Sequence, residues 1–269
     1  MTHSNHLDRL STHVGIYTMY DILTAALILC LGVMLSATAS AHDLTIYCEY
    51  TPPEKVTIGD KEGLIYAQVW ELMRRTNIEG PIQKVSWKRG YAEATSKPNI
   101  GLFPTTRTPE REELFYWIGP VLQVAWAFYG IKGSGLTVNS LEDAKNVRSI
   151  GTYANDSKEQ WLKAQGFTNL ISVLDRKTNI KKLYAGRLNL IVGSPSITDS
   201  WPEQLGLDPT MLKMLYQFKS VNLYLAISKE TPMEKVQALK KAFKDMVRDG
   251  TVRALYNKWA PSYKQPVTE

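Results

Sequence analysis

The chain has 269 residues, of which 44% are apolar and 22% are charged, and its formal net charge at pH 7 is +6. A length of this order fits one large domain or two modest ones. The apolar content is that of an ordinary globular protein and excludes an intrinsically disordered chain.

Residues 1–41 have the pattern of a secretory signal peptide. An apolar run extends from Ile22 to Leu35, and it is shorter than the about 20 residues that span a membrane. Small residues follow, and Ala39-Ser40-Ala41 fits the A-x-A pattern of a cleavage site. We therefore expect a cleaved signal peptide, a mature chain that begins at His42, and a periplasmic location. The alternative is an uncleaved N-terminal anchor.

The cysteines and the basic residues indicate neither redox chemistry nor nucleic-acid binding. Only Cys48 would remain after cleavage, so we expect it to be a buried apolar residue without an internal disulfide. The densest basic stretch, Lys235–Lys244, has the pattern of a solvated helix surface. The sequence has no metal-ligand cluster and no phosphate-binding glycine loop, so we expect no metal, no cofactor and no nucleic-acid partner.

After residue 41, short apolar runs alternate with helical patterns, which indicates an α/β fold with parallel strands. In the first half the expected elements are strands at Leu44–Tyr47, Ile82–Trp87, Ile100–Phe103 and Val121–Ile131, and a helix at Leu64–Arg75. In the second half they are strands at Ser149–Thr152, Leu188–Val192 and Val221–Ile227, helices at Ser157–Ala164 and Lys181–Ala185, and two helices within Met233–Trp259 broken at Asp249-Gly250. Two such α/β units joined by two strands would leave a cleft between them.

From Leu44 to Trp259 the chain resembles the bacterial extracellular solute-binding proteins of family 3, whose better-known members bind polar amino acids for ABC importers. The matching motifs are Thr106–Arg111 (TRTPER) followed by Phe115-Tyr116-Trp117, Gly186–Asn189 (GRLN), Tyr224–Lys229, and Asp249-Gly250-Thr251 with Trp259. The resemblance implies a two-lobed periplasmic-binding-protein-like α/β fold, in which two crossover strands join the lobes. Lobe 1 would comprise residues 42–127 and 227–269, and lobe 2 would comprise residues 128–226. The implied partners are a small polar solute and an inner-membrane ABC permease, and the implied state is a monomer.

In this family the arginine of the T-P-E-R motif binds the ligand carboxylate, a role that the resemblance transfers to Arg111. The planar guanidinium offers two parallel donors that match a carboxylate. Thr106 would add a hydroxyl and a backbone N–H. The alternative for Arg111 is a surface ion pair with Glu112 or Glu113.

Trp87 and Tyr50 fall where the family places aromatic side chains against the ligand. Aromatic rings offer contact area and attract a cation. The alternative for both residues is a place in the core of a lobe. Glu49 is a candidate acceptor for a ligand amine, and Arg89 could face either the cleft or the solvent.

Asp156 and Ser157 stand where the family has a turn at a helix N-terminus whose free N–H groups bind the carboxylate. Either residue would cap the helix, although Asp156 is an unusual neighbour for an anion. Ser194 stands where the family has the acid that binds the α-amino group, and Asn189 replaces another aspartate. The ligand therefore either lacks an α-amino group or places it on Glu49 or Asp156.

Together these observations predict a solute-binding protein without catalytic residues, specific for a small polar, carboxylate-bearing and amino-acid-like solute. Two alternatives stay open. One is a cleft enzyme of the same fold with dehydratase-like chemistry, for which Glu49 and Asp156 are the acid and base candidates. The other is a ligand-sensing module of a membrane receptor.

Overall fold

The structure is a computed structural model, and it describes residues 43–49, 61–194, 201–261 and 265–266. The expected signal peptide and Tyr50 lie outside these residues. Within them, no helix is both long enough and apolar enough to cross a membrane.

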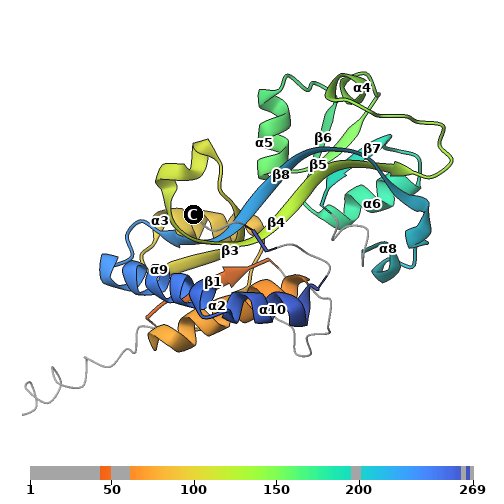
Figure 1. Ribbon diagram of the computed structural model, residues 1–269. Coiled ribbons are helices and arrows are strands. Elements are labelled where there is room, and N and C mark those ends of the chain that lie inside the picture. Colours follow the sequence, from red (N-terminus) through yellow and green to blue (C-terminus); the bar gives the residue numbers. More distant parts are fainter. Residues whose placement is uncertain (1–42, 50–60, 195–200, 262–264, 267–269) are drawn as a thin grey trace, which may run out of the picture. The chain divides into compact units, whose positions relative to one another are not determined.

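In the described part of the chain, eight strands form one mixed sheet in the order β2-β1-β3-β8-β4-β7-β5-β6 (Figure 1). β1 pairs in parallel with β2 and β3, and β5 pairs in parallel with β6 and β7. β4 and β8 are antiparallel to all their neighbours. The strands are β1 (Thr45–Cys48), β2 (Ile82–Lys84), β3 (Ile100–Thr106), β4 (Phe115–Ile131), β5 (Ile150–Tyr153), β6 (Leu170–Val173), β7 (Leu190–Gly193) and β8 (Leu212–Ser228).

β4 and β8 are the two long strands, with 17 residues each. They pair from Phe115 opposite Ser228 to Ile131 opposite Leu212, so they run side by side from one group of short strands to the other (Figure 1). The groups are β2-β1-β3 at one end and β7-β5-β6 at the other. This topology confirms the expected pair of α/β lobes joined by two crossover strands.

Each group of short strands has its own helices (Figure 1). The first lobe carries α2 (Lys61–Thr76), α3 (Trp87–Ser96), α9 (Met233–Arg248), α10 (Thr251–Trp259) and the 3-10 helix η1 (Pro109–Leu114). The second lobe carries α4 (Leu141–Lys145), α5 (Ser157–Ala164), α6 (Arg176–Tyr184), α8 (Trp201–Gln204) and the 3-10 helix η2 (Pro209–Met211).

Separate apolar clusters stabilise the two lobes. In the first lobe, Ile46 of β1 packs with Leu72 of α2 and Leu239 of α9, and none of the three has exposed surface. In the second, Ile150 of β5 and Leu162 of α5 are equally buried. Full burial of such a side chain contributes about 1.5–3 kcal/mol. Each lobe therefore has a core of its own, which leaves the surface between the lobes available for a ligand.

Most expected elements are present, but β4 begins at Phe115 and not at Val121, β8 begins at Leu212 and not at Val221, and α6 begins at Arg176 and not at Lys181. α5 has the predicted bounds, and Gly250 ends α9 with a φ of 83°, a left-handed conformation that favours glycine. Cys48 is buried, as expected. The strand expected to reach Trp87 was too long, because the Ser86 side chain accepts the Arg89 N–H and thereby starts α3.

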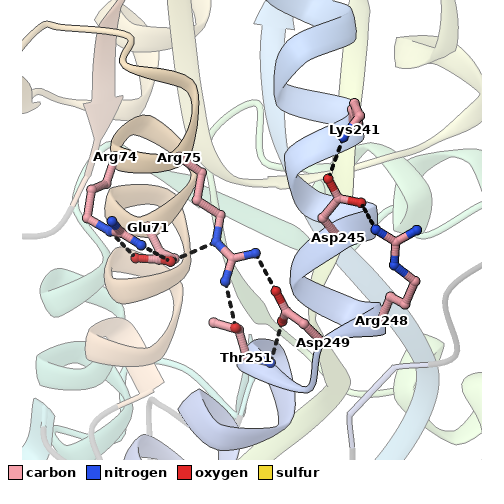
Figure 2. A network of polar contacts seen from close by, with 8 residues as sticks. All are labelled: Glu71, Arg74, Arg75, Lys241, Asp245, Arg248, Asp249 and Thr251. Carbon is pink, nitrogen blue, oxygen red and sulfur yellow. Dashed lines mark hydrogen bonds and ion pairs between the residues drawn. The ribbon is translucent and has the colours of Figure 1, made fainter.

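A polar network joins α2 to the junction between α9 and α10 (Figure 2). The guanidinium of Arg75 contacts Glu71 at 2.7 Å, Asp249 at 2.6 Å and Thr251 at 2.7 Å. Arg74 contacts the same Glu71 carboxylate at 2.8 Å. These contacts connect segments that lie far apart in the sequence and fix the C-terminal helices against the first lobe.

Candidate functional site

A cavity lies between the lobes, beside β4 and β8, with a volume of about 120 Å³. One ordered water requires roughly 10–15 Å³ of such space, so a solute of about ten non-hydrogen atoms has room here. All the described residues that the sequence predicted for ligand binding line the cavity: Glu49, Trp87, Thr106, Arg111, Asp156, Ser157 and Ser194. Tyr50 lies outside the described residues.

Arg111 is the most unusual of these side chains, because its charge is buried with little compensation. The residue lies on η1 and is only 2% exposed. Its guanidinium carbon lies 5.3 Å from the centre of the Trp87 ring and 5.2 Å from that of Tyr91. Nη2 donates to Gln160 Oε1 at 3.3 Å, while Nε has no acceptor among the described residues. Burial lowers the pKa of Arg111.

The surface ion pair considered for Arg111 is not formed with either neighbouring glutamate. Both oxygens of Glu112 bind the guanidinium of Arg107, and Glu113 lies 3.9 Å from Lys229. Within the described residues, no carboxylate lies at ion-pair distance from Arg111. A buried charge without a partner is costly, so an anionic ligand group would offset that cost.

Trp87 is the first residue of α3, and Ser86 at the N-cap fixes the start of this helix. The Trp87 ring lines the cavity and also packs against the apolar cluster behind it, at 5.5 Å from the Tyr91 ring. Trp87 therefore faces the cavity, as expected for a ligand contact, and also packs in the core of the lobe, as the alternative proposed. The Arg89 side chain is 61% exposed and pairs with Glu93, so it faces the solvent.

Asp156 caps α5 and is already neutralised by the protein. Its side chain accepts the Lys158 N–H at 2.9 Å and the Ser157 hydroxyl at 3.2 Å. Lys158 Nζ lies 3.1 Å and Arg176 Nη2 lies 3.2 Å from Oδ2. Burial by itself would raise the pKa of Asp156, but the two cations lower it well below its usual range. The negative charge of Asp156 is therefore offset by side chains of the protein itself.

Glu49 reaches from the end of β1 to two side chains of the second lobe. The Tyr153 hydroxyl donates to Glu49 Oε1 at 2.7 Å, and Arg176 Nη2 lies 3.2 Å from Oε2. The Arg176 guanidinium carbon lies 4.5 Å from the centre of the Tyr153 ring. Burial and the Glu49 charge raise the pKa of Tyr153. Glu49, Tyr153 and Arg176 thus form a direct polar contact between the lobes.

Sequence reasoning missed Tyr153, Lys158 and Arg176, all of which line the cavity. Arg176 is the first residue of α6, which was expected to begin only at Lys181. The polar start of α6 shows no apolar period. Asp175, whose side chain accepts the N–H groups of two residues in the first turn, was the available signal for an N-cap.

The remaining predicted residues line the cavity from two strand ends. Thr106 is the last residue of β3 and is 7% exposed, and Ser194 follows β7 directly. Asn189 does not line the cavity; its Oδ1 accepts the Ser149 hydroxyl at 3.1 Å. In the part of the chain that the structure describes, no group of three or more His, Cys, Asp or Glu side chains could hold a metal ion.

No protein-family model and no curated protein sequence matches the chain. Solved structures do match it. A histidine kinase sensor domain with similarity to periplasmic binding proteins has a TM-score of 0.71 at 14% identity, covering 83% of this chain and 97% of that domain. The arginine-, lysine- and histidine-binding protein ArtJ from Geobacillus stearothermophilus has a TM-score of 0.68 at 15% identity, covering 83% and 96%.

An ancestral arginine-binding protein bound to arginine has a TM-score of 0.66 at 19% identity, covering 81% of this chain and 97% of that one. Identities this low show the fold alone. The chain has the two-lobed fold of periplasmic binding proteins, as the resemblance to family 3 predicted. Two of the three similar structures are binding proteins and one is a sensor domain.

Proposed function

We propose that this chain is a solute-binding protein that captures a small polar, carboxylate-bearing and amino-acid-like solute between its lobes. The observation that supports this proposal most strongly is the environment of the Arg111 side chain. This side chain lies in the cavity, buried against the rings of Trp87 and Tyr91, with its Nε unpaired among the described residues. A carboxylate is the ligand group that a guanidinium binds with two parallel hydrogen bonds.

The solute would contact both lobes. Arg111, Thr106 and Trp87 belong to the proposed lobe 1, which spans residues 42–127 and 227–269. Ser157 and Ser194 belong to the proposed lobe 2, which spans residues 128–226. A solute held from both sides favours the closed arrangement of the lobes, since ligands shift populations toward the state that binds them better.

We propose that the protein binds its solute without converting it, because the two candidate acid and base residues are already paired with cations. Glu49 and Asp156 were the acid and base candidates for an enzyme, and both are bound to cations of the protein. A general acid or base needs a pKa near the working pH, whereas the pKa of Asp156 is held far below it.

We further propose that the mature protein begins at His42, acts as a monomer in the periplasm and delivers its solute to an inner-membrane ABC permease. A sensing role is the second candidate, because a histidine kinase sensor domain shares the fold. Deletion of the gene separates the two: loss of uptake of the radiolabelled solute supports import, while loss of a solute-induced transcriptional response supports sensing.

A thermal-shift screen of purified mature protein tests the binding function. The panel comprises amino acids, other carboxylic acids and polyamines, and a ligand at about 100 times its Kd stabilises the folded state by about 2.7 kcal/mol. We expect carboxylates to raise the Tm of the wild type and of Arg89→Ala, the exposed control. Arg111→Ala should abolish the shift. Stabilisation by polyamines alone would contradict the proposal.

A further inference from the structure

The protein holds its own Glu49 carboxylate in the cavity much as it would hold a ligand carboxylate. A hydroxyl of Tyr153 binds one oxygen at 2.7 Å, and a guanidinium nitrogen of Arg176 lies 3.2 Å from the other. The Arg176 guanidinium stacks on the Tyr153 ring, which orients both donors together. Glu49 belongs to the first lobe, whereas Tyr153 and Arg176 belong to the second. Its carboxylate therefore binds to the second lobe across the cavity, as the carboxylate of a solute would.

The charged side chains that line the cavity, among the described residues, are Arg111, Lys158, Arg176, Glu49 and Asp156. Asp156 binds Lys158 and shares Arg176, and Glu49 provides the second carboxylate on Arg176. Arg111 is then the one lining cation in this set without a carboxylate partner. With Glu49 in place, the described lining therefore offers one position for an anionic group.

We propose that Glu49 is a specificity-determining residue that restricts the cavity to solutes with a single anionic group and excludes dicarboxylates. By occupying Tyr153 and Arg176, it fills the second position where an anion could bind. A second ligand carboxylate at that position would meet the like charge of Glu49 in a partly desolvated site. The inference rests on the proposed function in one respect, namely that Arg111 receives the first carboxylate.

Removal of the Glu49 charge should allow dicarboxylates to bind. In Glu49→Gln, Arg176 and Tyr153 would face the cavity with one carboxylate fewer. A dicarboxylate could then place one end on Arg111 and the other on Arg176. A monocarboxylate has no group for the second position, so the change should favour dicarboxylates selectively.

Isothermal titration calorimetry with matched probes tests this selectivity. The pairs are succinate with butyrate, glutarate with pentanoate and adipate with hexanoate, so each pair differs by one carboxylate at constant chain length. We expect the ratio of dicarboxylate to monocarboxylate affinity to rise about tenfold or more in Glu49→Gln for at least one pair. Glu142→Gln changes the net charge equally at an exposed ion pair on α4, away from the lining residues, and should leave the ratio unchanged.

Further variants test whether the effect depends on the charge of Glu49 and on Arg176. Glu49→Asp keeps the charge and should keep the exclusion. The double variant Glu49→Gln/Arg176→Gln should lose the gain, because the second cation is gone. Glu49→Ala serves as a second neutral variant if Glu49→Gln unfolds at a lower temperature than the wild type.

The outcomes separate this inference from the proposed function. A ratio that stays constant in both neutral variants, or a gain that persists without Arg176, overturns the role of Glu49. A wild type that binds no carboxylate contradicts the proposed function. A gain of dicarboxylate binding in Glu49→Gln would still support the role of Glu49 in that case.

Discussion

The guanidinium carbon of Arg111 lies 5.3 Å from the centre of the Trp87 ring. The ring attracts the cation but cannot neutralise it. A residue chosen for stability alone would be apolar at this 2% exposed position, since buried charges without a partner destabilise a fold. The buried guanidinium of Arg111 therefore favours ligand binding at the expense of the stability of the ligand-free protein.

Two substitutions separate these effects. Arg111→Ala should weaken carboxylate binding by about 2–5 kcal/mol, which is about 30-fold to several thousand-fold. Arg111→Met should weaken carboxylate binding to a similar extent, but should raise the unfolding free energy of the ligand-free protein by about 0.5–2 kcal/mol. Calorimetry measures the first effect and chemical denaturation the second. Unchanged affinity in Arg111→Ala would place the ligand elsewhere, and a less stable Arg111→Met would mean that the guanidinium is already satisfied.

Ser194 tests whether the solute carries an α-amino group. Ser194→Asp should leave unchanged or strengthen the binding of an α-amino acid, because it restores an acid for the ammonium. It should weaken the binding of a plain carboxylic acid through like-charge repulsion in a partly desolvated cavity. Calorimetry with alanine and propionate, and with Ser194→Asn as the uncharged control, measures both signs. Tight α-amino acid binding by the wild type that Ser194→Asp weakens would refute the contact assigned to Ser194.

A substitution at Gly151 of β5 tests how closely α6 packs against the sheet of the second lobe. A Cβ at this position would lie 2.6 Å from Asn179 Oδ1 and 2.6 Å from Leu188 Cδ1. Asn179 is fixed, because its Nδ2 donates to Thr152 O at 3.0 Å. Gly151→Ala should therefore cost about 1–3 kcal/mol of unfolding free energy. At Gly130 the closest atom is the flexible end of Leu215, at 2.8 Å, so Gly130→Ala should cost less in the same denaturation experiment. Equal costs would contradict this account.

The lowered pKa of Glu71, in the network shown in Figure 2, should make the stability of the protein depend on pH. The hydrogen bond from Arg74, assisted by Arg75, lowers the pKa of Glu71 to about 2 from its ordinary value of 4.5. A carboxyl whose pKa is lower in the folded state stabilises the protein fully above the unfolded pKa, and the contribution disappears as the pH falls through the folded pKa.

The stability difference between wild type and Glu71→Gln should therefore be constant above about pH 4.5 and shrink as the pH falls toward 2. Urea denaturation across this range measures it. Glu142→Gln, at an exposed pair where Glu142 is 75% accessible, should have little effect at any pH. A difference that does not depend on pH would mean that Glu71 acts through packing alone.

The sequence predicted most of the short strands and the apolar helices, because each of these elements has a local pattern, but it predicted neither α3 nor β6. α5 was predicted with its observed bounds, and the break before α10 followed from Asp249-Gly250. By contrast, α3 buries only Gly90 and Ala94, which are too small to mark an apolar face. β6 is largely exposed, so its pattern was weak as well.

The full lengths of β4 and β8 also required the tertiary structure. The sequence indicated only the apolar parts, Val121–Ile131 and Val221–Ile227. Each strand continues beyond its apolar run because the partner strand supplies backbone hydrogen bonds along 17 residues. Such pairing needs no apolar side chain at every position.

For the site, the resemblance of short motifs identified Arg111, Thr106 and Ser194 as residues of one cavity, and the structure brings them together there. The contact of Glu49 with Tyr153 and Arg176 could not be predicted, since its members lie in three separate segments. Whether a carboxylate binds a ligand or a neighbouring arginine depends on distances of about 3 Å. Local sequence patterns determined which charged residues are present; the packing of the two lobes decided which of them neutralise one another.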